Sequence, residues 1–99
     1  MFFVYIIESE KNGMNYIGYS DDPERRLKEH NESLHNTFTS KHRPWKLVAR
    51  FPVSENRGDA MHVEKYIKGR KSRSLIETII LNQENAAYIN KLKLLSSIG

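Results

Sequence analysis

The stretch FVYIIESEKNGMNYIGYS, residues 3–20, has a tyrosine near each end and a turn signal in its middle. Residues 2–8 are mostly β-branched or aromatic, which predicts a strand. Asn12-Gly13 favours a two-residue type I′ turn, because both central positions of that turn have positive φ. Residues 15–19 would then form the return strand, so the sequence predicts a β-hairpin.

The predicted turn determines which side chains share a face of the hairpin. Counting outward from a two-residue loop places Ser9 opposite Tyr16 and Tyr5 opposite Ser20. Tyr5 and Tyr16 therefore share a face, with Gly18 leaving space between them, whereas a slip of one residue would separate them. Strand parity alone favours two tyrosines that pack in a core, and a shallow pocket with phenol oxygens at its edge stays open.

Helix caps, periodicity and breakers predict the rest of the chain. A helix is predicted to begin at Asp21-Asp22-Pro23 and to fade near Ser33, followed by a loop over 34–44. A strand is predicted over 45–53, weakened at its far end by Pro52. Three helices follow: one over 56–68 stopped by Gly69, one opened by Ser72 or Ser74, and a short one over 86–95. This β-β-α-β-α-α order predicts an α+β domain, a small three-stranded antiparallel sheet flanked by helices. We expect a single domain over residues 1–99, with a core of about 2–82 and a C-terminal helical tail at 86–95.

Composition is that of an ordinary globular domain, with 38% hydrophobic and 28% charged residues among 99. Sixteen Lys and Arg against twelve Asp and Glu give a net charge of +4, which suits a nucleic-acid partner and equally a solvated surface. The absence of cysteine excludes a disulfide framework and a thiolate metal site. No segment has the length of a membrane span or the form of a signal peptide, so we expect a cytoplasmic protein.

The first predicted helix carries basic side chains. Arg26 and His30 are four residues apart and therefore lie on the same face, one turn from each other, and Arg25 adds a second guanidinium. A solvated basic face is one interpretation. A phosphate site is the other, because the planar fork of an arginine donates two hydrogen bonds at once.

The second predicted helix has a carboxylate within its apolar stripe. Ala60, Val63 and Ile67 recur at helical spacing, and Glu64 lies among them. A carboxylate that faces a core must be paired, protonated or bound to a cation. Spacing alone favours an ion pair with Lys68, four residues on. A single-carboxylate Mg²⁺ ligand stays open, because Mg²⁺ accepts one carboxylate while keeping most of its waters.

Four cations gather near the predicted joint between the second and third helices: Lys68, Arg70, Lys71 and Arg73. They suit a phosphate backbone, and they also suit a solvated surface. His35, His42 and His62 have no metal-ligand spacing, so a zinc site is not expected.

Taken in order, these residues resemble the GIY-YIG nuclease domain. The first motif of that family ends in tyrosine and here reads Phe3-Val4-Tyr5, with Phe3 where the family has glycine, and the second motif is intact as Tyr16-Ile17-Gly18. The family's arginine, histidine and later glutamate are matched by Arg26, His30 and Glu64. The resemblance covers nearly the whole chain. It is strongest to the small stand-alone bacterial members, which are related to the N-terminal nuclease domain of the excision-repair incision subunit.

The resemblance implies a metal-dependent endonuclease that hydrolyses DNA phosphodiester bonds, with a link to DNA repair or recombination. It implies one Mg²⁺ or Mn²⁺ on Glu64, an Arg26 that neutralises the phosphoryl oxygens, and Tyr5 or Tyr16 orienting or deprotonating the attacking water. Positive charge from Arg26, His30 and the metal would lower the tyrosine pKa for that task.

DNA is the implied partner, bound by Arg25 and by the four cations at the helix joint. Neither a membrane nor a small-molecule cofactor is expected, and a monomer is favoured. Two other functions stay open: a catalytically weak nucleic-acid-binding module of the same fold, and a structural or partner-binding domain with an incidental basic face. Asn90 is a candidate for an asparagine that the family often has late in the domain, with no role assigned.

Overall fold

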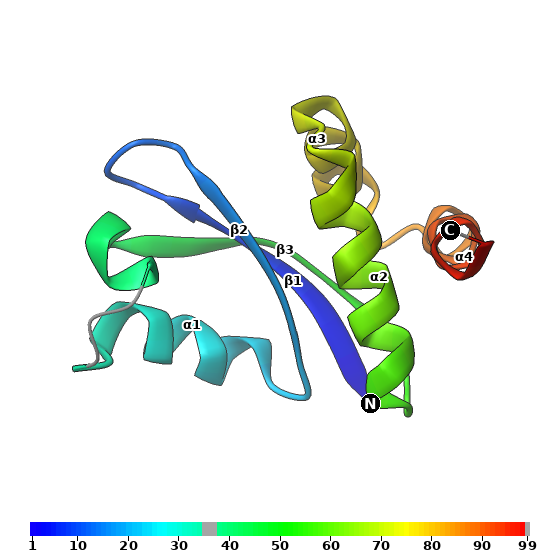
Figure 1. The fold of residues 1–99 in the computed structure, drawn as a ribbon, viewed down its shortest axis with the longest axis horizontal. Coiled ribbons are helices and arrows are strands. Elements are labelled where there is room, and N and C mark those ends of the chain that lie inside the picture. Colours follow the sequence, from blue (N-terminus) through cyan, green and yellow to red (C-terminus); the bar gives the residue numbers. More distant parts are fainter. Residues whose placement is uncertain (35–37, 99) are drawn as a thin grey trace.

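The computed structural model describes residues 1–34 and 38–98 (Figure 1). Three strands, β1 (Phe2–Ser9), β2 (Asn15–Ser20) and β3 (Trp45–Ser54), form one antiparallel sheet in the order β2-β1-β3. The helices of the described chain are α1 (Pro23–Glu32), the 3-10 helix η1 (Thr39–His42), α2 (Arg57–Arg70), α3 (Arg73–Asn82) and α4 (Ala86–Ile98). The predicted α+β fold is therefore confirmed. None of the helices in these ranges is long and apolar enough to cross a membrane.

Helices cover both faces of the sheet, so successive residues of the central strand β1 are buried on opposite sides. Tyr5 faces α1, where its hydroxyl contacts His30. Val4 and Ile6 belong to the main hydrophobic core, together with side chains of α2, α3 and α4. Buried members of that core are Val4, Ile6, Ile17, Ala49, Phe51, Val53, Ala60, Val63, Ile67, Ile79, Ile89 and Leu92.

The turn between β1 and β2 differs from the predicted type I′ turn. The backbone N–H of Ser9 donates to the carbonyl of Met14 at 2.8 Å, so the loop has four residues, 10–13, instead of two. Side chains stabilise the longer loop: Ser9 Oγ accepts from the N–H of Lys11 at 3.1 Å, and Asn12 Oδ1 accepts from the N–H of Met14 at 3.1 Å. Of the predicted central pair, only Gly13 has positive φ, at 76°.

This longer loop shifts the pairing of the hairpin by two residues from the predicted register. Tyr5 lies opposite Gly18, and Ile7 lies opposite Tyr16. Because side chains alternate with a period of two, a shift of two keeps every residue on its predicted face. Tyr5 and Tyr16 therefore share a face, as predicted.

Helix caps agree with the sequence at two starts and disagree at one end. Asp22 Oδ1 accepts from the N–H of Arg25 at 3.1 Å to begin α1, and Ser72 caps α3 in the same way. The prediction that Gly69 stops the second helix is wrong. That helix continues to Arg70, and Lys71 takes the left-handed conformation (φ 48°) that usually falls to glycine.

Three other elements differ in extent from the prediction. β3 continues past Pro52 to Ser54 because β3 is an edge strand, where a proline nitrogen can face away from the ladder. The predicted loop over 34–44 contains η1, whereas residues 35–37, including His35, lie outside the described residues. The C-terminal helix predicted over 86–95 is present and extends to Ile98.

The C-terminal end of α1 is tied to the start of β3 by four hydrogen bonds, which we call the α1–β3 clasp. Arg43 donates through Nε to the carbonyl of His30 and through Nη2 to that of Ser33, each at 2.6 Å. The Asn31 side chain donates to the Trp45 carbonyl at 2.9 Å and accepts from the Trp45 N–H at 2.7 Å. The clasp satisfies helix-end carbonyls and fixes α1 against the sheet.

Candidate active site at the edge of the sheet

A cleft of about 380 Å³ lies along the edge strand β2, where α1 reaches from one face of the sheet and α2 from the other. Its lining includes Tyr5 from β1, Tyr16 from β2, Arg25 and Arg26 from α1, and Glu64 from α2. The structure thus brings together four of the five side chains predicted as catalytic. His30, the fifth, lies behind them.

Tyr5 forms the floor of the cleft and is only 1% exposed. Its hydroxyl lies 2.9 Å from His30 Nε2 and also bonds Arg26. Because a guanidinium only donates, we assign the phenol oxygen as acceptor toward Arg26 and donor toward His30. Burial raises the pKa of Tyr5, and Arg26 offsets part of that rise. Tyr5 is therefore an anchored, protonated phenol.

Gly18 lies opposite Tyr5 on β2, and the Tyr5 ring packs directly against it. A Cβ added to Gly18 would lie 2.4 Å from the Tyr5 hydroxyl oxygen and 2.5 Å from the ring carbon that bears it. The glycine of the second motif thus makes room for the tyrosine of the first. The space that sequence reasoning placed between the two tyrosines is filled by Tyr5 itself.

Gly18→Ala is therefore expected to destabilise the protein by about 1 to 3 kcal/mol, because the buried Tyr5 ring cannot move without losing its hydrogen bonds. The measurement is urea unfolding followed by circular dichroism. Gly69→Ala is the matched control: a Cβ there meets nothing within 4 Å on a helix, so alanine should stabilise by up to about 1 kcal/mol. Equal stability of the two variants would contradict the close packing of Tyr5 on Gly18.

Tyr16 has a different environment. Its ring centroid lies 4.9 Å from that of His30, and the Lys68 ammonium lies over the ring at 5.1 Å. The residue is partly exposed, and its hydroxyl makes no hydrogen bond to any other described residue. Of the two tyrosines, Tyr16 is the one whose phenol is available to a bound molecule.

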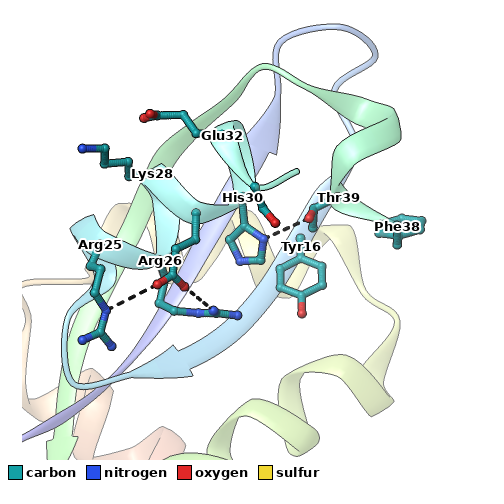
Figure 2. A pocket seen from close by; sticks show the side chains of 10 residues that line it. Tyr16, Arg25, Arg26, Lys28, His30, Glu32, Phe38 and Thr39 are labelled. Atoms are coloured by element: carbon teal, nitrogen blue, oxygen red, sulfur yellow. Dashed lines mark hydrogen bonds and ion pairs between the residues drawn. The ribbon is translucent and has the colours of Figure 1, made fainter. Parts of the chain in front are cut away.

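Arg26 is held by carboxylate and phenol partners. Its Nη1 donates to Glu29 Oε1 at 2.5 Å, and Arg25 Nε lies 3.7 Å from the other oxygen of Glu29 (Figure 2). Arg25 also bonds Asp21 at 3.1 Å. The two guanidiniums therefore border the cleft with Glu29 between them, and the planar fork of Arg26 can present further N–H groups to an anion.

Glu64 combines the two interpretations that the sequence left open. It is 7% exposed, and its Oε1 lies 2.5 Å from the ammonium of Lys68, so the predicted ion pair is present. The same carboxylate lines the cleft beside Tyr16 and Arg26. Among the described residues no group of three or more His, Cys, Asp or Glu side chains is arranged to hold a metal ion. A metal ion bound in this cleft would therefore have the Glu64 carboxylate as its protein ligand, without a cluster of further His, Cys, Asp or Glu ligands among the described residues.

His30 is buried, and it accepts from Tyr5 while its Nδ1 lies 3.1 Å from Thr39 Oγ1. Burial, together with the positive charge of Arg26, lowers the pKa of His30 to about 4. Arg43 acts in the same direction and Glu29 in the opposite one. His30 is therefore neutral at pH 7, and the expectation that it supplies positive charge to a tyrosine is wrong.

The lowered pKa of His30 predicts a pH dependence of stability. A histidine with a pKa of 6.5 when unfolded and about 4 when folded binds more protons unfolded, so stability falls as pH falls through this window. The contribution reaches about 3 kcal/mol between pH 6.5 and 4, and is constant above pH 7. Urea unfolding of wild type and His30→Gln across this range isolates it, because carboxylate titration is common to both. Parallel curves would refute the neutral, buried state of His30.

The predicted nucleic-acid contacts lie on both sides of the cleft. Arg25 borders it on α1, and Lys68 borders it on α2. Arg70, Lys71 and Arg73 are exposed at the α2–α3 joint, where Arg73 Nη1 lies 3.4 Å from Asn15 Oδ1 at the start of β2. The cations therefore extend along the same sheet edge as the cleft.

Two further positions near the cleft were not predicted from the sequence, and Asn90, which was named without a role, lies away from it. Arg57 lines the cleft and stacks on Phe2 at 5.0 Å, and Phe38 lies beside Tyr16, yet neither carried a pattern that marked it in the sequence. Asn90 lines a separate hollow beside Phe3 and α4, which shares no residue with the cleft. One signal in the sequence could have marked Phe38: it is an aromatic residue within the mostly polar segment 34–44.

Comparisons with known proteins agree with this arrangement. Residues 1–88 match the GIY-YIG catalytic domain family. UPF0213 protein YazA of Bacillus subtilis is 32% identical over 89 residues, which cover 88% of each chain. The solution NMR structure of UPF0213 protein BH0048 from Bacillus halodurans matches with a TM-score of 0.51 and 28% identity, over 91% of this chain and 94% of that one.

A relative that matches over a shorter stretch carries a functional name. The structure-specific endonuclease subunit SLX1 of Meyerozyma guilliermondii is 43% identical over 51 residues, which are 46% of this chain and 17% of its own length. The family match extends over most of the chain, and both tyrosine-containing motifs meet in the cleft. The protein therefore belongs to the GIY-YIG catalytic domain family and has a fold of the nuclease type.

Proposed function

We propose that the protein is a divalent-metal-dependent endonuclease that hydrolyses DNA phosphodiester bonds. The observation that carries this proposal is the convergence of Tyr16, Arg26 and Glu64 on one cleft at the edge of the sheet. A carboxylate can hold the metal ion, a guanidinium can stabilise charge on the phosphoryl oxygens, and a phenol can orient the attacking water. The name of the relative SLX1, which matches 46% of this chain, supports the same reaction class.

The residues fit a divalent cation. The nearly buried carboxylate of Glu64 lines the cleft, where a negative charge needs a cation beside it. The Lys68 ammonium now pairs with its Oε1, and because that side chain is 46% exposed it can move into water when a metal ion binds. A carboxylate oxygen is the ligand that Mg²⁺ or Mn²⁺ prefers, and one such ligand suffices when waters and substrate phosphate complete the shell. When bound there, the ion would polarise the phosphate and stabilise the leaving oxygen.

The chain's own side chains would divide the remaining work. Arg26 would donate to the non-bridging phosphate oxygens and stabilise the charge that develops on them. Tyr16 would orient the attacking water through its hydroxyl, because the Tyr5 hydroxyl is occupied by His30 and Arg26. Tyr5 and His30 would hold Arg26 and the Tyr16 ring in place. Water adds to phosphorus and loses a proton to solvent, while the bond from phosphorus to the leaving oxygen breaks and that oxygen takes up a proton.

The exposed cations would bind the phosphate backbone on either side of the cleft. Arg25 lies on one side, and Lys68, Arg70, Lys71 and Arg73 lie on the other. Such contacts fix the register of a strand without reading its bases. Affinity should therefore fall steeply with salt concentration.

The test is incubation of the purified protein with end-labelled duplex, single-stranded and branched DNA, each with Mg²⁺, with Mn²⁺ and with EDTA. Cleavage of at least one substrate that requires the metal supports the proposal. Salt-sensitive binding without cleavage under any metal would replace it with the catalytically weak binding module. Neither binding nor cleavage would leave a structural or partner-binding domain as the better interpretation.

A further inference from the structure

A second hollow, of about 660 Å³, adjoins the active-site cleft. The two share Tyr16, Arg25 and Arg26 in their linings, so a molecule bound at the cleft can extend directly into the hollow. Its other walls come from the C-terminal half of α1 and from the segment that begins η1 (Figure 2). The volume is within the range of sites that hold a nucleotide-sized ligand.

One wall of this hollow is aromatic. Phe38 is 51% exposed, and its ring is stacked toward that of Tyr16, with the centroids 6.4 Å apart and the planes at 30°. Figure 2 shows the Tyr16 ring between those of His30 and Phe38. Folding gains little from a half-exposed phenylalanine at the mouth of a hollow, whereas a flat ligand would gain a stacking surface.

Phe38 is also supported from behind. The His42 ring lies 4.8 Å from that of Phe38 and is itself held by the Asn12 amide at 3.0 Å from Nδ1. The next residue, Thr39, is buried, and its carbonyl accepts from the Trp45 indole at 2.8 Å. The Phe38 ring is therefore held between neighbours, His42 and Thr39, that are fixed by their own hydrogen bonds. This lowers the entropy cost of stacking a ligand against the ring.

The polar rim of the hollow has the charge that a nucleotide needs. Three cations, Arg25, Arg26 and Lys28, lie along α1 with two carboxylates, Glu29 and Glu32, so the lining has a net charge of +1. Glu29 is already paired with both guanidiniums. A base attached to a phosphate held at Arg26 would thus find an aromatic face within the adjoining hollow. Sequence-tolerant recognition of single strands uses this combination of stacking rings and backbone cations.

We propose that this hollow binds an unpaired nucleobase next to the phosphate in the cleft, with Phe38 as the stacking platform. The inference rests on the proposed function and deepens it, because a base can enter only when it is not paired and stacked within a duplex. Substrates with an unpaired nucleotide at the reacting position would bind more tightly than a blunt duplex. Phe38 would set that preference without touching the reacting atoms.

The test measures binding without metal, so that it does not depend on hydrolysis. A short single strand carrying one 2-aminopurine, and the blunt duplex of the same sequence, are titrated with wild type, Phe38→Ala, Phe38→Trp and Leu81→Ala. Leu81 is the control, because it is exposed on α3 away from both hollows. Circular dichroism verifies that each variant is folded.

Wild type should bind the single strand and quench its 2-aminopurine fluorescence. Phe38→Ala should lose roughly 10-fold in affinity for the single strand, together with the quenching, and keep its duplex affinity. Phe38→Trp and Leu81→Ala should behave like wild type. Equal loss on both DNAs, or no loss with Phe38→Ala, would overturn the base site even if cleavage stands. Stronger competition by free dAMP than by the single strand would also overturn it, in favour of a mononucleotide site. If wild type bound neither DNA, the proposed function would fall with it.

Discussion

Glu64→Gln is expected to lower metal-dependent cleavage at least about 1,000-fold, which corresponds to roughly 4 kcal/mol of transition-state stabilisation. Glutamine keeps the shape of the side chain but removes the charge that would hold the cation. The fold should persist, because the Lys68 ammonium left without its partner is 46% exposed and reaches water. Single-turnover cleavage gives the activity, and calorimetric titration with Mn²⁺ gives the metal affinity.

Glu77→Gln is the matched control for this prediction. Glu77 forms an ion pair with Arg73 at 3.7 Å, four residues apart like Glu64 and Lys68, but it is exposed on α3. It should cleave and bind Mn²⁺ like wild type. Cleavage by Glu64→Gln at the wild-type rate would mean that the activity of the preparation comes from a contaminant or from another site. Unchanged Mn²⁺ affinity would remove Glu64 as the metal ligand.

Arg26→Lys is expected to reduce kcat by about 100- to 1,000-fold with little change in KM, because the contact strengthens as charge develops on the phosphate. Lysine keeps the positive charge but loses the planar fork that serves Tyr5, Glu29 and a phosphate together. Arg26→Ala should be at least as impaired. Steady-state cleavage with the substrate preferred by wild type separates kcat from KM.

Arg50→Lys supplies the comparison for Arg26→Lys. Arg50 also pairs with a glutamate of α1, Glu24, but it lies on β3, at the edge of the sheet opposite β2, and does not line the cleft. It should retain wild-type kcat and KM. If Arg26→Lys raised KM and left kcat unchanged, Arg26 would bind the ground state and the transition state equally, contrary to the role proposed for it.

The sequence predicted the fold well because its signals were local. The β-branched and aromatic run in residues 2–8, the Asp22 cap and the Ser72 cap each depend on a few neighbouring residues. The predicted type I′ turn was wrong because the side chains of Ser9 and Asn12 accept hydrogen bonds from the loop backbone. A rule based on the dipeptide Asn12-Gly13 does not include these bonds. The face assignment survived only because the register error was an even number of residues.

The sequence predicted which residues line the site, but it did not predict the role of each one. An ordered resemblance identifies Tyr5, Tyr16 and Glu64, whereas burial distinguishes the sealed phenol of Tyr5 from the accessible one of Tyr16. The neutrality of His30 depends on burial beside Arg26, and these contacts form only when α1 packs on the sheet. Phe38 has no periodicity to mark it, and its relation to Tyr16 exists only in three dimensions.

The side chains of the α1–β3 clasp come from the two ends of the connection, Asn31 and Arg43. Arg43 and Asn31 fix the end of α1 and the start of β3 directly to each other, so the position of α1 does not depend on how many residues join them. Closing a somewhat longer connection costs little, because the entropy of closure grows only with the logarithm of length. A change to the connection that keeps Arg43 of the clasp and Thr39, which contacts His30, is therefore expected to leave α1 in place. Exchange of Phe38 alone would then change the proposed base preference without moving α1.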